Sequence, residues 1–160
     1  HLDHIGVVAR REGVSLILDR VNELSDGLPV IVTGDFNAEP ESDVIKHMTD
    51  AENPKHLQDT RLMSPIVYGP SWSFHDFGKI PYDKRPLIDY VFVRNDLKVL
   101  SYGVRDRRIR VFIGSCSGAG YCRVVFYFLN FRLKIINLRF RRFIFRFRIE
   151  YLVLCTMNNK

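Results

Sequence analysis

The sequence predicts an α/β fold followed by a basic tail of different composition, from three observations. An amphipathic segment between Arg10 and Leu24 predicts a helix, and the apolar run from Pro29 to Thr33 that follows predicts a core strand. A helix leading into a core strand is typical of layered α/β domains. The charge then changes sign along the chain. Residues 1–100 carry 11 Lys and Arg against 16 Asp and Glu, whereas residues 101–160 carry 13 against 2.

The first helix is predicted from apolar residues that recur at steps of three and four, with charged residues between them. They are Val14, Ile17, Leu18, Val21 and Leu24. Gly27 supplies a stop signal, and the β-branched run up to Thr33 predicts a strand that is buried on both faces. A turn-forming segment, residues 34–40, separates this strand from a short helix expected over residues 42–48.

The middle of the chain predicts a long loop and then three strands. Residues 49–70 are expected to be mostly loop, with strands at 72–74, 87–93 and 97–102. Asp89 is the only polar residue between Leu87 and Val93. A carboxylate within a buried strand requires a partner or a function, because an unpaired buried charge is costly.

The last third of the chain differs from the rest. It is rich in Arg and Phe and shows no pattern of turns and caps. We therefore expect a domain over residues 1–104 and a tail over residues 105–160 that is foreign to it, as a misread exon boundary or reading frame would produce. The longest apolar run, Val124 to Leu129, is too short for a membrane-spanning helix. The chain does not begin with Met, so we expect a longer parent protein; compartment and oligomeric state stay open.

Four residues are candidates for chemistry: His1, Asp35, Asn37 and Asp89. Asp35 and Asn37 follow a buried strand, and if the segment stays extended both side chains turn to one face. A carboxylate and an amide there can orient water and a phosphate oxygen, and acidic groups attract Mg²⁺. The alternatives are turn or capping roles for Asp35 and Asn37, and a satisfied buried carboxylate for Asp89. Trp72 and His75 are candidates for substrate contact, or are simply core and loop residues.

The motifs together resemble the endonuclease/exonuclease/phosphatase superfamily. They are His1-Leu2-Asp3-His4, then Gly34-Asp35-Phe36-Asn37-Ala38, Trp72-Ser73-Phe74 and Ile88-Asp89-Tyr90. The resemblance covers about residues 1–102 and corresponds to the C-terminal half of the superfamily domain. It implies part of a four-layered, DNase-like α/β sandwich. It also implies hydrolysis of a phosphodiester or phosphomonoester by water, with Mg²⁺ or Mn²⁺ as cofactor. The substrate would be nucleic acid, a phosphoinositide or another phosphate ester.

The same resemblance implies a role for each candidate. Asp35 orients or deprotonates the attacking water and is a possible metal ligand. Asn37 holds the phosphate, His1 donates to a phosphoryl oxygen, and Asp89 holds a second histidine.

That histidine is not found, because no histidine follows His75, and the family's metal-binding Glu is also missing. We therefore expect this chain to be an inactive fragment. The alternatives are a nucleic-acid or anionic-membrane binding module that acts through the basic tail, and an inactive pseudoenzyme whose tail completes the core.

Overall fold

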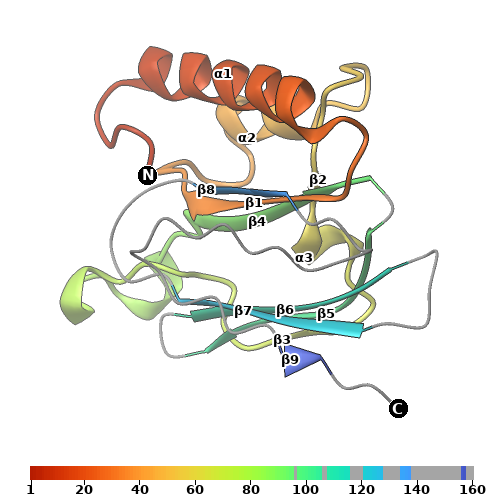
Figure 1. The fold of residues 1–160 in the computed structure, drawn as a ribbon. Coiled ribbons are helices and arrows are strands. Elements are labelled where there is room, and N and C mark those ends of the chain that lie inside the picture. The colour runs from red at the N-terminus through yellow and green to blue at the C-terminus, as the bar shows by residue number, and fades with distance from the viewer. Residues whose placement is uncertain (96, 106–107, 116–120, 128–133, 138–155, 158–160) are drawn as a thin grey trace.

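The computed structural model describes residues 1–95, 97–105, 108–115, 121–127, 134–137 and 156–157. Two sheets face each other, and two helices cover the outer side of the first sheet (Figure 1). The described strands of the first sheet lie in the order β2-β4-β1-β8, and those of the second in the order β3-β5-β6-β7-β9. This mixed, layered arrangement of helices and sheets is the α/β fold class that the sequence predicts.

The first sheet is built around β1 (Val30–Asp35), which pairs antiparallel with β4 (Asp89–Arg94) and with β8 (Lys134–Asn137). Strand β2 (Gln58–Asp59) pairs with the other edge of β4. Val30, Ile31 and Val32 are each at most 1% exposed, which confirms a strand buried on both faces.

The helical layer consists of α1 (Val7–Ser25) and α2 (Asp43–Thr49). Val14, Ile17, Leu18 and Val21 of α1 are buried in the main core. The helix ends where Asp26 adopts a left-handed conformation, followed by Gly27 at φ +73. Leu24, expected on the buried stripe, is instead 61% exposed, because Ser25 takes the buried position in the last turn.

The second sheet contains β3 (Val67–Tyr68), β5 (Leu97–Arg105), β6 (Arg108–Ser115), β7 (Tyr121–Tyr127) and β9 (Thr156–Met157). Strands β5, β6 and β7 pair antiparallel in sequence order, so part of the segment assigned to the tail continues this sheet. Short β3 pairs parallel with β5. Among the described residues, no helix has the length and apolarity needed to cross a bilayer.

One sequence prediction for the middle of the chain is wrong. Residues 72–74 do not form a strand; instead the backbone amides of Ser73 and Phe74 both donate to Pro86 O, at 3.0 and 3.2 Å. Residues 49–70 are mostly loop, as the sequence predicts, and they also contain β2, β3 and the single-turn helix α3 (Thr60–Met63). Elements of two to four residues are too short to show a periodicity in the sequence.

Candidate functional site

Asp35 and Asn37 lie at the end of β1 and are joined by a local turn. The Asn37 amide N donates to Asp35 Oδ1 at 2.8 Å, while Phe36 between them is fully buried. The segment does not stay extended, because Asn37 has a φ of +46. The condition for strand alternation is therefore not met, although the two side chains still reach a common neighbour, His1. The turn role that the sequence offered as an alternative for Asp35 and Asn37 is present. It uses Asp35 Oδ1 and leaves Oδ2 for other partners.

His1 meets this turn from the N-terminal segment. Its Nε2 lies 3.6 Å from Asp35 Oδ2 and 3.2 Å from Asn37 Nδ2. Two hydrogen bonds hold the segment there, from Leu2 N to Asp35 O at 2.9 Å and from Asn37 Nδ2 to Leu2 O at 3.0 Å. With the amide nitrogen as donor, His1 Nε2 is the acceptor in its contact with Asn37.

Asp89 is brought to the same place by strand pairing. It is the first residue of β4 and lies directly opposite Asp35 in the antiparallel ladder. Residues in that relation have their side chains on the same face of the sheet, so the two carboxylates are neighbours. Three of the four predicted catalytic residues thus surround Asp35: His1, Asn37 and Asp89.

Ser73 is a member of the site that sequence reasoning missed. Its Oγ accepts hydrogen bonds from the backbone amides of Ile88 and Asp89, at 3.0 and 3.1 Å. The hydroxyl also hydrogen-bonds the Asp89 carboxylate. Its position inside the Trp72-Ser73-Phe74 motif was the only available signal.

Both carboxylates are harder to ionise than an ordinary aspartate. Burial raises the pKa of Asp89 to about 6; the Ser73 hydrogen bond opposes this rise and the charge of Asp35 adds to it. Burial also raises the pKa of Asp35, against the opposing effect of the Asn37 amide. A carboxylate with a raised pKa is a stronger base, which suits proton transfer near neutral pH.

Trp72 and His75 lie together on the loop that precedes β4. Their rings meet edge to face with centroids 5.7 Å apart. Trp72 also packs against Tyr82, and the Arg85 guanidinium lies 4.6 Å from the indole centroid. Trp72 precedes Ser73, so this cluster is one residue from the group that holds Asp89. A contact with substrate stays a prediction for both residues.

Asp3 and His4 of the first motif lie outside this cluster. The Asp3 carboxylate accepts from the amides of Ile5 and Gly6 at 3.1 and 3.0 Å, and these bonds lower the pKa of Asp3. The side chain of His4 is 70% exposed and lies 3.9 Å from Asp3 Oδ1. Asp3 therefore shapes the turn that leads into α1 and does not form part of the site.

The donors at the site are suitable for a hard divalent cation but do not enclose one. No group of three or more His, Cys, Asp or Glu side chains able to hold a metal occurs in the described part of the chain. Mg²⁺, however, is commonly held by one or two carboxylates together with waters and substrate phosphates. The facing pair, Asp35 and Asp89, is of that kind, and burial raises the pKa of both carboxyl groups, against the opposing charge of the N-terminal ammonium.

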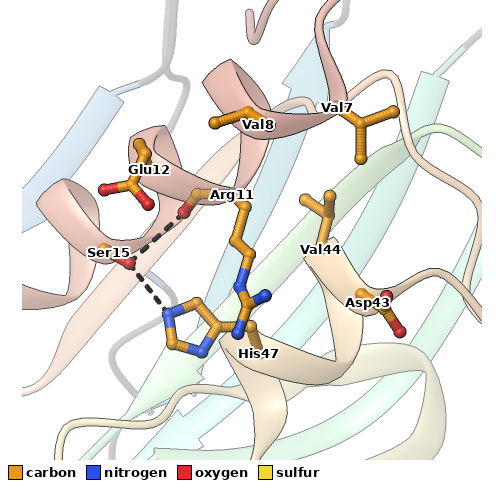
Figure 2. A pocket seen from close by; sticks show the side chains of 8 residues that line it. All are labelled: Val7, Val8, Arg11, Glu12, Ser15, Asp43, Val44 and His47. Atoms are coloured by element: carbon orange, nitrogen blue, oxygen red, sulfur yellow. Dashed lines mark hydrogen bonds between the residues drawn. The ribbon is translucent and has the colours of Figure 1, made fainter.

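A hollow lies between α1 and α2, on the helical side of the first sheet and apart from the cluster around Asp35 (Figure 2). It has a volume of about 370 Å³ and is lined by Val7, Val8, Arg11, Glu12, Ser15, Asp43, Val44 and His47. Ser15 Oγ lies 2.9 Å from His47 Nε2 and also donates to Arg11 O at 3.3 Å.

This serine–histidine pair does not form a hydrolytic dyad. When the single hydroxyl hydrogen is given to Arg11 O, His47 Nε2 must be the donor to Ser15, and in that tautomer it cannot deprotonate the serine. Within the described residues, no carboxylate hydrogen-bonds His47 to reverse the tautomer. The pair instead links α1 to α2.

Comparison with known proteins identifies a family whose sequence model matches this chain. The sequence model of the endonuclease/exonuclease/phosphatase family matches residues 3–111. None of the curated proteins matches the chain.

Three solved structures are similar to it. An endonuclease/exonuclease/phosphatase from Bacteroides vulgatus is 35% identical, with a TM-score of 0.60 over 64% of this chain and 39% of that protein. A mannosyl-6-phosphatase from Bacteroides thetaiotaomicron is 30% identical, with a TM-score of 0.57 over 69% and 40%. A conserved protein of unknown function from Enterococcus faecalis is 25% identical, with a TM-score of 0.59 over 72% and 48%. The chain thus spans less than half the length of each.

Proposed function

This chain belongs to the endonuclease/exonuclease/phosphatase family, and on that premise we propose that its site takes part in Mg²⁺-dependent hydrolysis of a phosphoester by water. The observation that carries the proposal is the pairing of Asp35 with Asp89 at one point of the strand ladder, with His1 and Asn37 against Asp35. Such a cluster combines a base, two hydrogen-bonding groups for phosphate and hard oxygens for a cation.

In this mechanism Asp35 Oδ2 takes a proton from the attacking water, because Oδ1 is held by the Asn37 amide. Asn37 has two side-chain N–H groups. Leu2 O accepts from one, and His1 Nε2 accepts from the other. When His1 is protonated at Nε2 it no longer accepts, so the second N–H is released to a phosphoryl oxygen. A protonated His1 donates to the phosphoryl group as negative charge accumulates there.

Asp89 acts through its neighbours. It faces Asp35 with Ser73 behind it, so it adds negative charge beside the base and a second oxygen donor for a cation. Bound Mg²⁺ would neutralise the charge of the phosphate, and Asp35 is the described residue best placed to offer it an oxygen. The described residues provide only part of a metal site. We therefore expect the chain alone to bind phosphate esters more readily than it turns them over.

The substrate class follows in part from one relative. The Bacteroides thetaiotaomicron protein is described as a mannosyl-6-phosphatase, which acts on a phosphomonoester. The first ester to test is therefore mannose 6-phosphate, with bis(p-nitrophenyl) phosphate as the diester alternative.

The test separates binding from turnover. In the presence of Mg²⁺, mannose 6-phosphate should shift the NMR signals of the Asn37 side-chain amide and the His1 ring. Asn37→Ala should abolish binding, whereas Ser15→Ala, in the hollow between α1 and α2, should leave it intact. Any hydrolysis should require Mg²⁺ and disappear in Asp35→Ala. Binding that is equal in wild type and Asn37→Ala, or hydrolysis that persists in EDTA, would refute the proposal.

A further inference from the structure

The loop between Trp72 and Pro86 holds a cation whose hydrogen-bonding capacity is largely unused. The guanidinium of Arg85 lies 4.6 Å from the Trp72 ring centroid and 5.2 Å from that of Tyr82. Its Nε donates to Ile80 O at 3.0 Å. The two rings contact each other edge to face at 5.7 Å. Arg85 is thus fixed in orientation by two aromatic rings and one backbone carbonyl.

Among the described residues, no carboxylate binds the outer nitrogens of this guanidinium. No carboxylate lies within ion-pair distance of Arg85 in the part of the chain that the structure describes. Lys79 on the same loop does pair with an acid, Asp76, at 3.5 Å. Arg85 is also half-buried. A half-buried guanidinium held in place without a counter-ion is suited to grip an external phosphate or carboxylate through two parallel hydrogen bonds.

Arg85 is also close along the chain to the residues of the candidate active site. Ser73 N donates to Pro86 O, and Ser73 Oγ holds the amides of Ile88 and Asp89, so the two ends of the loop are clamped together. Trp72 directly precedes Ser73 and Arg85 directly precedes Pro86, so both lie beside the hydrogen bond that joins the two ends of the loop. Arg85 lies four positions before Asp89 in the chain, so their Cα atoms are at most about 14 Å apart. Figure 1 shows this loop at the end of the sheets where β1 finishes and β4 begins.

From this arrangement we propose that Arg85 is a specificity-determining residue that binds a second anionic group of the substrate, separate from the phosphate to be cleaved. The inference rests on the proposed function, because it presumes that a phosphoester occupies the Asp35 site. It narrows the substrate class to phosphoesters that carry a further phosphate or carboxylate. Trp72 and Tyr82 are then positioning residues, which act by holding the guanidinium.

The experiment compares two ligands that differ by one phosphate, glucose 6-phosphate and glucose 1,6-bisphosphate. Their affinities are measured by calorimetry with Mg²⁺ and the 160-residue chain. The wild-type protein should bind the bisphosphate about 10-fold more tightly or better. Arg85→Gln should abolish that advantage and leave the affinity for the monophosphate unchanged. Lys84→Gln is the matched control, because it removes an adjacent, exposed cation and should preserve the advantage.

Further outcomes separate this inference from the proposed function. Equal binding of both ligands by the wild type would overturn the inference, as would equal losses in Arg85→Gln and Lys84→Gln, which would indicate a general charge effect. Loss of monophosphate binding in Arg85→Gln would place Arg85 on the cleaved phosphate and also overturn it. If Asn37→Ala binds both ligands normally, the proposed function itself fails.

A second variant covers the case in which Arg85→Gln does not fold. Tyr82 is 67% exposed, so Tyr82→Ala removes one ring from the guanidinium with little effect on the core. This variant should lose part of the bisphosphate advantage at unchanged monophosphate affinity. If Arg85→Gln does not fold and Tyr82→Ala still binds the bisphosphate as much more tightly than the monophosphate as the wild type does, the inference is overturned.

Discussion

The hydroxyl of Tyr90 joins the two halves of the candidate site, and its removal is the most informative single perturbation. Tyr90 is 1% exposed, and its hydroxyl hydrogen is shared between Ala38 O at 2.8 Å and Leu87 O at 3.2 Å. Ala38 directly follows Asn37, and Leu87 lies two residues before Asp89. Burial raises the pKa of Tyr90, so the group remains a protonated donor throughout the working pH range.

Tyr90→Phe removes this bridge and leaves the packing in place. The ring stacks on Phe92 at 5.3 Å and meets Phe36 edge to face at 5.7 Å, and phenylalanine preserves both contacts. Two buried carbonyl oxygens lose their shared donor, which should lower the free energy of unfolding by about 2 kcal/mol. For a chain of 160 residues that corresponds to a fall in Tm of about 4 to 8 °C.

Urea unfolding followed by circular dichroism measures the loss of stability, and the NMR signals of Asn37 measure its local effect. Tyr82→Phe is the control, because an exposed hydroxyl should contribute less than about 0.5 kcal/mol. In Tyr90→Phe the Asn37 amide signal should shift or broaden. A variant as stable as the wild type, with an unchanged Asn37 signal, would refute the idea that Tyr90 ties the two segments together.

Two further predictions concern charge and backbone. Asp89 has a raised pKa in the folded protein, so wild-type stability should fall as pH rises from about 4 through about 6. In metal-free buffer, Asp89→Asn should be more stable than wild type by roughly 2 kcal/mol at pH 8, with no gain at pH 3.5; a difference independent of pH would contradict this. Gly69 has a φ of +86, and a Cβ there would collide with Val104 O, so Gly69→Ala should destabilise the protein by about 2 kcal/mol or more. Gly27, at φ +73 with open space around it, is the control, and equal urea midpoints for the two Gly→Ala variants would exclude a collision at Gly69.

The strands that carry the site were predictable because their uninterrupted apolar runs are typical of buried strands. The apolar runs of β1 and β4 are buried as expected, and Asp89 was conspicuous as the one polar residue in such a run. The partners of Asp89 were not predictable. Ser73 reaches it from 16 positions earlier in the chain, through bonds that no periodicity encodes.

Local conformation was the least predictable part of the site. Asn37 adopts a left-handed backbone conformation, which asparagine tolerates. Nothing in the neighbouring sequence indicates this conformation, so the extended segment that strand alternation requires could not be checked from the sequence. The stacking of Arg85 on Trp72 joins residues from the two ends of a loop. The expected boundary at residue 104 stays a prediction, and the family match extends to residue 111. The proposed binding role of the basic tail also stays a prediction.

The opposition of Asp35 and Asp89 in the ladder has an evolutionary consequence. Since neighbouring backbones align the two acids, exposed loops between residues 36 and 88 can change in length without moving them apart, as long as Asn37 and Ser73 keep their hydrogen bonds to Asp35 and Asp89. Insertions in these loops can change which ligands bind, while Asp35 and Asp89 keep their positions. In a family with this arrangement, ligand specificity can change faster than the chemistry of the site.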